Sequence, residues 1–149
     1  MPADQFLSLP FEQQIGQFFF IGLPGTTIDK EARELLDEIK PGGVILFGRN
    51  IESSEQVRQL LDDCRKLLPM RPLCGIDQEG GLVDRLRTVF PPMPSARALR
   101  QHGDLAGVRT LGRITGELLR MLGFDINFAP VMSIITQERS QLTNGLYSR

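Results

Sequence analysis

Two carboxylate side chains, Asp77 and Glu79, follow a short apolar segment at 73–76 and precede the glycine pair Gly80-Gly81. The apolar segment is typical of a buried strand, and the glycines permit the turn that a chain makes on leaving it. In parallel α/β proteins, ligands bind at the carboxyl ends of the strands. A carboxylate placed there loses hydration unless a polar partner replaces it, and ligand hydroxyl groups are one such partner. The alternative is that the loop itself satisfies both carboxylates, and the motif alone leaves that alternative open.

The composition is that of an ordinary globular protein. Its 149 residues suit one domain, with 41% hydrophobic and 23% charged residues. The net charge of −1 gives no electrostatic reason to expect binding to nucleic acid or to an anionic membrane. No apolar run approaches the roughly 20 residues that span a bilayer, and the first residues lack the pattern of a signal peptide. We therefore expect a cytoplasmic protein.

The residue types that most often bind metals are few. Cys64 and Cys74 both fall among apolar residues, where we expect small buried side chains with free thiols in a reducing compartment. The single histidine, His102, lies in the predicted connection before the longest helix, and we expect it to be exposed to solvent. These residues do not predict a metal site.

Apolar runs alternate with helical patterns along the whole chain. The apolar runs are 17–22, 43–47, 73–76 and 124–129. The apolar spacing predicts helices at about 10–15, 28–39, 53–68 and 104–122. The alternation predicts right-handed βαβ units and a parallel sheet.

Two features of the helices are specific. Ser53 and Gln56 form a predicted capping box at the start of one helix. In the longest helix, Gly112 and Gly116 lie close to the apolar stripe and would permit a close approach to a strand, at some cost in helix propensity. The residues expected to face inward there are Leu105, Val108, Leu111, Leu118, Leu119 and Leu122.

Two architectures fit a parallel sheet of this kind. One is a doubly wound sheet, and the other is the first half of a (β/α)8 barrel, whose full length is about 250 residues. The turn at 22–27, after the first strand, matches neither of the glycine motifs that bind phosphate. Periodicity alone does not decide between the two.

Several motifs, taken in order, point to a family. They are Ile15-Gly16-Gln17-Phe18, the run 41–47, Arg49-Asn50, the run 75–81, Val83, Arg85 and the run 127–131. Together they resemble the N-terminal barrel domain of glycoside hydrolase family 3, and most of all its bacterial β-N-acetylglucosaminidases that recycle cell-wall fragments. The resemblance implies that residues 1–149 are the first half of a TIM-type barrel, with about four parallel strands and their helices.

The resemblance also implies an activity. Family members of this branch remove terminal non-reducing β-linked N-acetylhexosamine with retention of configuration, without a metal or organic cofactor. Such chemistry needs a nucleophilic carboxylate and a proton donor on opposite faces of the sugar. In the family these are an Asp and a His that would lie beyond Arg149, so we expect no catalytic residue in this chain and an inactive fragment. Asp77 and Glu79 do not replace them, since positions i and i+2 reach the sugar from one side.

Three residues match sugar contacts of the family. Asp77 would accept hydrogen bonds from sugar hydroxyl groups, and Arg85 and Arg149 would bind the same polar ligand. For each, the alternative is a surface salt bridge. Two positions depart from the family pattern: Leu82 stands where an Arg is usual, and Ser133 where an Asp is common. These departures leave the preferred sugar open, and a family 3 β-glucosidase fragment or a non-catalytic sugar-binding half-barrel are the alternatives.

A half-barrel has a physical consequence. Its sheet leaves an unpaired edge at each end and exposes the face that would line the barrel. We therefore expect the isolated chain to self-associate or to be only marginally stable.

Overall fold

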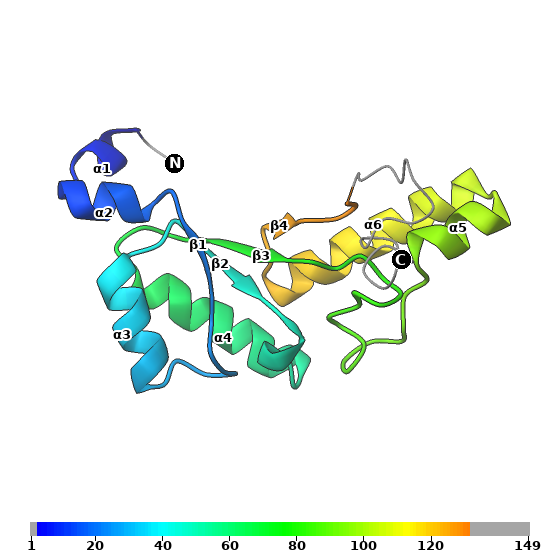
Figure 1. The fold of residues 1–149 in the computed structure, drawn as a ribbon, viewed down its shortest axis with the longest axis horizontal. Coiled ribbons are helices and arrows are strands. Elements are labelled where there is room, and N and C mark those ends of the chain that lie inside the picture. The colour runs from blue at the N-terminus through cyan, green and yellow to red at the C-terminus, as the bar shows by residue number, and fades with distance from the viewer. Residues whose placement is uncertain (1–2, 132–149) are drawn as a thin grey trace, which may run out of the picture.

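The computed structural model describes residues 3–131, except for the side chains of Ala3 and His102. The elements in chain order are α1 (Ala3–Leu7), α2 (Phe11–Gly16), β1 (Phe20–Gly22), α3 (Lys30–Ile39), β2 (Gly43–Leu46), η1 (Gly48–Asn50), α4 (Ser54–Leu67), β3 (Leu73–Ile76), α5 (Ala96–His102), α6 (Leu105–Leu122) and β4 (Ile126–Asn127) (Figure 1). The predicted strands and the four predicted helices are confirmed. Three short helical elements, α1, η1 and α5, were not predicted, and α5 occupies the connection in which His102 was expected to lie in a loop.

The strands form one parallel sheet in the order β1-β2-β3-β4. Each strand lies beside the strand that follows it in the sequence. A doubly wound sheet would reverse its order at one point to place helices on both faces, whereas consecutive neighbours are the order found around a barrel. The topology therefore decides the alternative that periodicity left open.

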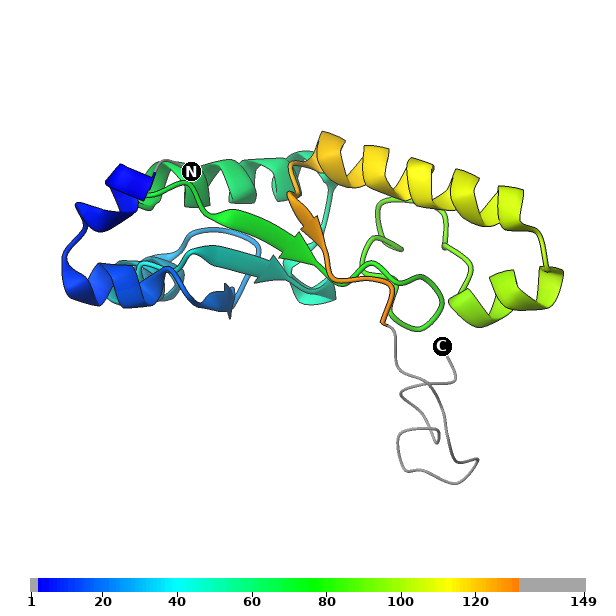
Figure 2. The same ribbon diagram turned by 90° about the horizontal axis from the view of Figure 1, so that it is seen from above.

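The sheet buries one face beneath the helices. Ile21, Val44 and Cys74 lie side by side in the strand register, and the last two are fully buried. In Figure 2, α4 and α6 lie on the same side of β3, and they contact one another. Burying one Leu or Val side chain in such a core contributes about 1.5–3 kcal/mol. The fully buried apolar core residues include Leu36, Val44, Leu46, Val57, Leu61, Cys64, Cys74 and Ile76.

The cysteines are part of this core. Cys64 and Cys74 are both buried and free. Burial raises the pKa of the Cys64 thiol to about 12 and that of Cys74 to about 11. Both thiols are therefore protonated at neutral pH, as is typical of small buried core residues.

The start of α4 follows the predicted capping box only in part. The Ser53 hydroxyl accepts a hydrogen bond from the amide of Gln56 at 3.1 Å. The Gln56 side chain accepts from the amide of Glu52 at 3.0 Å, one residue before the expected donor. It also donates to the Thr26 carbonyl at 2.6 Å, so that this glutamine joins α4 to the loop after β1.

The long helix α6 differs from its prediction. Leu119 and Leu122 are buried, but Leu105 is 73% exposed and Val108 is 39% exposed. Figure 1 shows the reason, since the first half of α6 extends past the sheet with α5 beside it. The close approach to a strand that Gly112 and Gly116 would permit does not occur, because an added Cβ at either position would meet no atom within 4 Å.

Close backbone contact occurs instead where α2 meets the start of β2. The amide of Gly42 donates to the Gly16 carbonyl at 3.1 Å. A Cβ at Gly42 would overlap the carbonyl oxygen of Gln17, and a Cβ at Gly16 would overlap that of Ile39. Glycine at these two positions therefore lets the N-terminal helix lie directly against the sheet.

Asp125 fastens β4 to its neighbours. Its carboxylate accepts from the amide of Cys74 at 3.0 Å and pairs with Arg71 at 2.8 Å and Arg65 at 3.3 Å. Arg65 also donates to the carbonyl of Gly123. Partial burial alone would raise the pKa of Asp125, but the Cys74 amide and the two guanidinium groups outweigh it and lower that pKa below its ordinary value.

Replacing Gly42 by Ala should lower the free energy of unfolding by about 1–3 kcal/mol, because the added methyl group must displace backbone. Replacing Gly112 by Ala should raise it by about 0.5–1 kcal/mol, since the site is open and Ala is the better helix former. Urea denaturation measures both. A destabilising Gly112→Ala would contradict the open surroundings of α6.

The Asp125→Asn variant should lose about 1–2 kcal/mol of unfolding free energy at pH 7, because it removes charge-assisted hydrogen bonds from a partly hydrated carboxylate. The folded pKa of Asp125 is lowered, so this stabilisation is complete above the unfolded pKa and is lost as the pH falls below about 4. Denaturation of both proteins across pH 3–7 tests this. A difference that stays constant down to pH 3 would show that the charge of Asp125 contributes nothing.

Candidate functional site

The carboxyl ends of the first two strands are joined by Asn50. This side chain is fully buried. Its Oδ1 accepts from the amide of Phe47 at 2.9 Å, and its Nδ2 donates to the carbonyls of Leu23 at 3.0 Å and Gly25 at 2.7 Å. A buried amide with all these partners satisfies backbone groups that the sheet leaves unpaired. It therefore fixes the loop after β1 against the loop after β2.

Gln78 plays the corresponding part after β3. It is 3% exposed, and its Oε1 accepts from the amide of Leu86 at 3.1 Å. Its backbone amide donates to Oδ1 of Asn127 at 3.0 Å, and its carbonyl accepts from Nδ2 of the same residue at 3.2 Å. Gln78 thus joins two parts of the loop after β3 to each other, and it joins that loop to the end of β4.

Asp84 also stabilises the loop after β3. It is 5% exposed, and its two carboxylate oxygens accept from Nε2 of Gln78 at 2.7 Å and from the amide of Met93 at 2.8 Å. A buried carboxylate is stable only when paired or hydrogen-bonded, and here two donors satisfy it. The long loop at 77–95 is therefore built around a buried glutamine–aspartate pair.

The glycine pair is required by the same loop. Gly80 and Gly81 have φ angles of +84° and +61°, which favour glycine. A Cβ at Gly81 would also come within 2.6 Å of Cβ of Ser95. The turn predicted from these glycines is confirmed, and it lets the loop fold back on itself.

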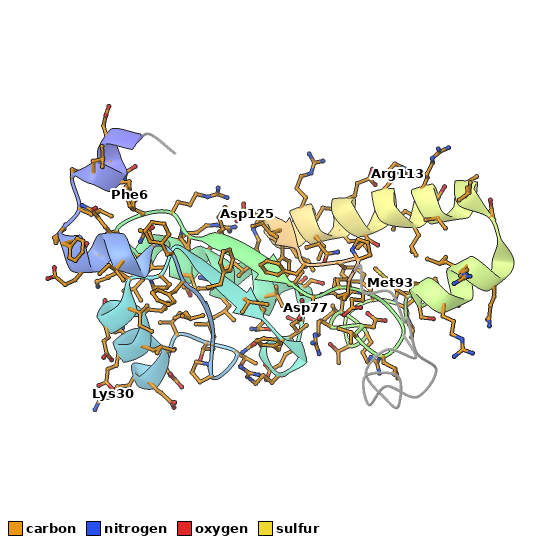
Figure 3. The ribbon with its side chains drawn as sticks, turned by 45° about the horizontal axis from the view of Figure 1, so that its top comes forward. Phe6, Lys30, Asp77, Met93, Arg113 and Asp125 are labelled. Carbon is orange, nitrogen blue, oxygen red and sulfur yellow. The ribbon has the colours of Figure 1, made fainter. Side chains whose placement is uncertain are left out.

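Asp77 and Arg85 lie together on this frame. Nη2 of Arg85 is 3.6 Å from Oδ2 of Asp77, and each side chain is 28% exposed. Figure 3 shows Asp77 between the strands and the loop that carries Met93. The distance between these two atoms is too long for a short hydrogen bond. The Asp77 carboxylate therefore keeps lone pairs that a ligand hydroxyl can use.

Phe47 supports the arginine. The guanidinium of Arg85 lies 5.5 Å from the centre of the Phe47 ring, and that of Arg49 lies 4.8 Å from it. Arg49 also donates to the Leu23 carbonyl at 3.3 and 3.2 Å. Cation–π attraction to this ring stabilises both guanidinium groups and limits how far Arg85 moves from Asp77.

Sequence reasoning did not assign Phe47, Arg49 or Asp84 to the site. Phe47 and Arg49 follow β2 as Asp77 follows β3, and this shared position at the strand end was the signal that could have found them. Asp84 gave no such signal, because its partners Gln78 and Met93 become neighbours only when the loop folds.

The remaining predicted residues stand as follows. Leu82, at the position where the family usually has an Arg, is 62% exposed beside the glycine turn. The backbone amide of Glu79 donates to the Val83 carbonyl at 3.0 Å. Arg149 and Ser133 lie outside the described residues.

Among residues 3–131, no group of three or more His, Cys, Asp and Glu side chains is arranged to hold a metal ion. In the same part of the chain, no helix is long and apolar enough to cross a membrane. Within that part of the chain, the guanidinium groups of Arg49 and Arg85 lie over the Phe47 ring, and Arg85 pairs with the Asp77 carboxylate.

This arrangement defines a class: a parallel α/β protein of barrel topology, with polar groups at the carboxyl ends of its strands. The model of the glycosyl hydrolase family 3 N terminal domain matches residues 11–149. The chain therefore belongs to glycoside hydrolase family 3, and its four parallel strands and helices are the first half of the TIM barrel of that domain.

Relatives of known name agree. The chain is 39% identical over 120 residues to a beta-hexosaminidase of Thioalkalivibrio sulfidiphilus, covering 76% of this chain and 35% of that protein. It is 41% identical over 120 residues to a beta-hexosaminidase of Alkalilimnicola ehrlichii, covering 76% of this chain and 34% of that one. The chain thus spans about a third of the length of these curated relatives.

Solved structures are similar as well. A glycoside hydrolase family 3 beta-N-acetylglucosaminidase from a Paenibacillus species has a TM-score of 0.76 and 35% identity, covering 83% of this chain and 24% of that one. A beta-N-acetylhexosaminidase from Beutenbergia cavernae has a TM-score of 0.74 and 28% identity, covering 87% of this chain and 40% of that one.

Replacing Asp84 by Ala should lower the free energy of unfolding by about 2–4 kcal/mol, because it leaves Nε2 of Gln78 and the amide of Met93 buried without an acceptor. Glu52→Ala, at an exposed carboxylate, is the control and should change it by less than about 0.5 kcal/mol. Chemical denaturation measures both variants. Equal, small effects would show that water satisfies the loop in place of Asp84.

Proposed function

We propose that this chain is the N-terminal part of a retaining β-N-acetylhexosaminidase that removes terminal non-reducing N-acetylhexosamine from β-linked glycans. The observation that carries the proposal is the Asp77–Arg85 pair at the carboxyl ends of the strands, on a chain whose family and named relatives are glycoside hydrolases. We further propose that residues 1–149 form one incomplete barrel domain. Its substrate would be an N-acetylglucosamine-containing fragment of the cell wall, processed in the cytoplasm as part of carbohydrate metabolism.

Asp77 would bind the sugar and not react with it. An ionised carboxylate accepts two hydroxyl hydrogen bonds at once, which would fix the orientation of the sugar ring in the site. Arg85 would orient that carboxylate from one side, and Phe47 would limit the movement of the arginine. Positioning of this kind lowers the barrier because the reacting bond is held in a geometry close to the transition state.

The groups that break the glycosidic bond would come from the part of the barrel that follows. Retaining hydrolysis places a nucleophilic carboxylate on one face of the sugar and a proton donor on the other. The strands described here contribute one side of the pocket. A polypeptide of these 149 residues would then bind the sugar weakly without cleaving it.

The complete reading frame that contains this sequence should hydrolyse 4-nitrophenyl N-acetyl-β-D-glucosaminide, and the first product seen by proton NMR should be the β-anomer. Asp77→Ala should lower kcat/KM about 10- to 100-fold, since it removes hydrogen bonds to a charged acceptor worth about 1.5–3 kcal/mol. Asp63→Ala is the matched control, because Asp63 is a carboxylate on α4 that pairs with Lys66 at 3.4 Å.

The alternatives give different results in the same assay. Preference for 4-nitrophenyl β-D-glucoside would identify a β-glucosidase of this family. Affinity for N-acetylglucosamine without turnover by the complete protein would identify a sugar-binding protein. A kcat/KM that Asp77→Ala and Asp63→Ala leave equally unchanged would remove Asp77 from the site.

A further inference from the structure

A group of arginines lies at the end of the sheet that is remote from Asp77. Asp125 lies beside Cys74 near the start of β3, whereas Asp77 follows the end of β3 (Figure 3). Next to Asp125 is a hollow of about 360 Å³, a volume typical of the smaller ligand sites. We call it the arginine hollow, and its charged lining residues are Arg58, Asp62, Arg65, Arg71, Arg120 and Asp125.

Three separate segments supply these arginines. Arg58 and Arg65 are on α4. Arg71 lies in the segment before β3, and Arg120 lies in the last turn of α6. The two helices contact each other, so their side chains can reach one ligand. Because the segments meet only in the folded chain, the cluster differs from the solvated charged face of a single helix.

Both carboxylates in the arginine hollow are already paired. The two oxygens of Asp125 pair with Arg71 at 2.8 Å and with Arg65 at 3.3 Å. The two oxygens of Asp62 pair with Arg65 at 3.1 Å and with Arg58 at 3.5 Å. Each carboxylate oxygen therefore faces a guanidinium group, so an anion that enters the hollow meets no unpaired carboxylate.

Two of the arginines also cover the end of α6. Arg58 donates to the Met121 carbonyl at 2.7 Å, and Arg65 donates to the Gly123 carbonyl. A helix ends in carbonyl groups that carry partial negative charge, and uncovered carbonyls would repel an anion. The two guanidinium groups therefore remove a second source of repulsion from the hollow.

The other two arginines keep free donors. Within residues 3–131, Arg120 has no ion-pair partner, and Arg71 pairs only with Asp125 and is 64% exposed. Four guanidinium groups and two carboxylates give the hollow a surplus of two positive charges, on a chain whose net charge is −1. Like charges gathered around one hollow repel each other, and they attract a counter-ion.

We propose that the arginine hollow binds a phosphate group, either as inorganic phosphate or as the end of a phosphomonoester. A phosphate group presents at least three acceptor oxygens to donors that come from several directions, whereas a carboxylate presents two. The planar donor fork of a guanidinium group binds two of these oxygens at once. Arg71 and Arg120 supply the free donors, and Arg58 adds positive charge from α4. The site is separate from Asp77 and does not rest on the proposed sugar binding.

Isothermal titration calorimetry tests the proposal on the complete protein that contains this sequence. Inorganic phosphate and glycerol 3-phosphate are separate probes, each titrated in a low-salt buffer free of phosphate and sulfate. At least one probe should bind saturably, and added sodium chloride should weaken that binding because the arginines are partly exposed. Binding of both probes would show that the phosphate group alone is recognised, and preference for one would identify its source.

Variants place the binding. Arg120→Gln should weaken it about 10-fold, since it removes charge-assisted hydrogen bonds to the anion, and Arg71→Gln should act in the same direction. Arg113→Gln is the matched control, because it removes the same charge from the same helix, where Arg113 pairs with Glu117 at 2.9 Å. Its affinity should change by less than about 2-fold. Arg120 loses no ion pair of the described residues when it is replaced, so its variant should fold normally.

Three results would overturn the proposal. The first is no saturable binding of either probe. The second is equal weakening by Arg120→Gln and Arg113→Gln, which would show general attraction to a charged surface. The third is loss of phosphate binding in Asp77→Ala, which would place the anion at the other end of the sheet. Unchanged phosphate affinity in Asp77→Ala, whatever that variant does to sugar hydrolysis, supports a separate site.

Discussion

All four strands run parallel, so their carboxyl ends meet at one edge, and the backbone groups released there must find partners outside the sheet. Asn50 and Asn127 provide those partners, each through a side-chain amide that both donates and accepts, and the buried Gln78 side chain holds the loop after β3. An amide is suited to this role because it satisfies carbonyls and amides of different loops at once without placing a charge in the core. The positions of Phe47, Asp77 and Arg85 depend on this hydrogen bonding.

Different interactions stabilise the two ends of the sheet. At the amino end, β4 is attached through Asp125 and its arginines, and α2 is attached by backbone contact at Gly16 and Gly42. At the carboxyl end, neutral amides and one buried aspartate hold the loops through hydrogen bonds. Charges therefore stabilise the end remote from the proposed site, whereas neutral amides hold most of the site end. The partly exposed pair there, Asp77 with Arg85, stands on a frame that is itself largely uncharged.

The face of the sheet that the helices do not cover bears on both the stability of the chain and the proposed site. Relatives of this family are about three times as long as the match, and the chain alone presents half-exposed rings where a barrel has a packed interior. The site at the strand ends and the apolar layer beneath it belong to the same incomplete surface. The proposed sugar binding therefore depends on how the half-barrel is completed.

The sequence by itself determined the elements and the family. Apolar periodicity predicted the four strands and the main helices, because burial of one face repeats at the spacing of each element. The ordered motifs predicted the barrel and predicted that Asp77 and Arg85 contact the same ligand; the structure places the two side chains 3.6 Å apart. Local sequence did not show how α6 packs. Gly112 and Gly116 would permit close contact with a strand, but no atom lies within 4 Å of a Cβ at either position. The first half of α6 extends past the sheet.

Only the tertiary structure decided the rest. The strand order excluded a doubly wound sheet, since order depends on which strands meet and not on where each begins. Gln78 and Asp84 meet within the folded loop at 77–95, and the Phe47 ring after β2 contacts Arg85 of that loop. Such contacts leave no periodic trace in the sequence, because they are set by how the loops fold over the strand ends.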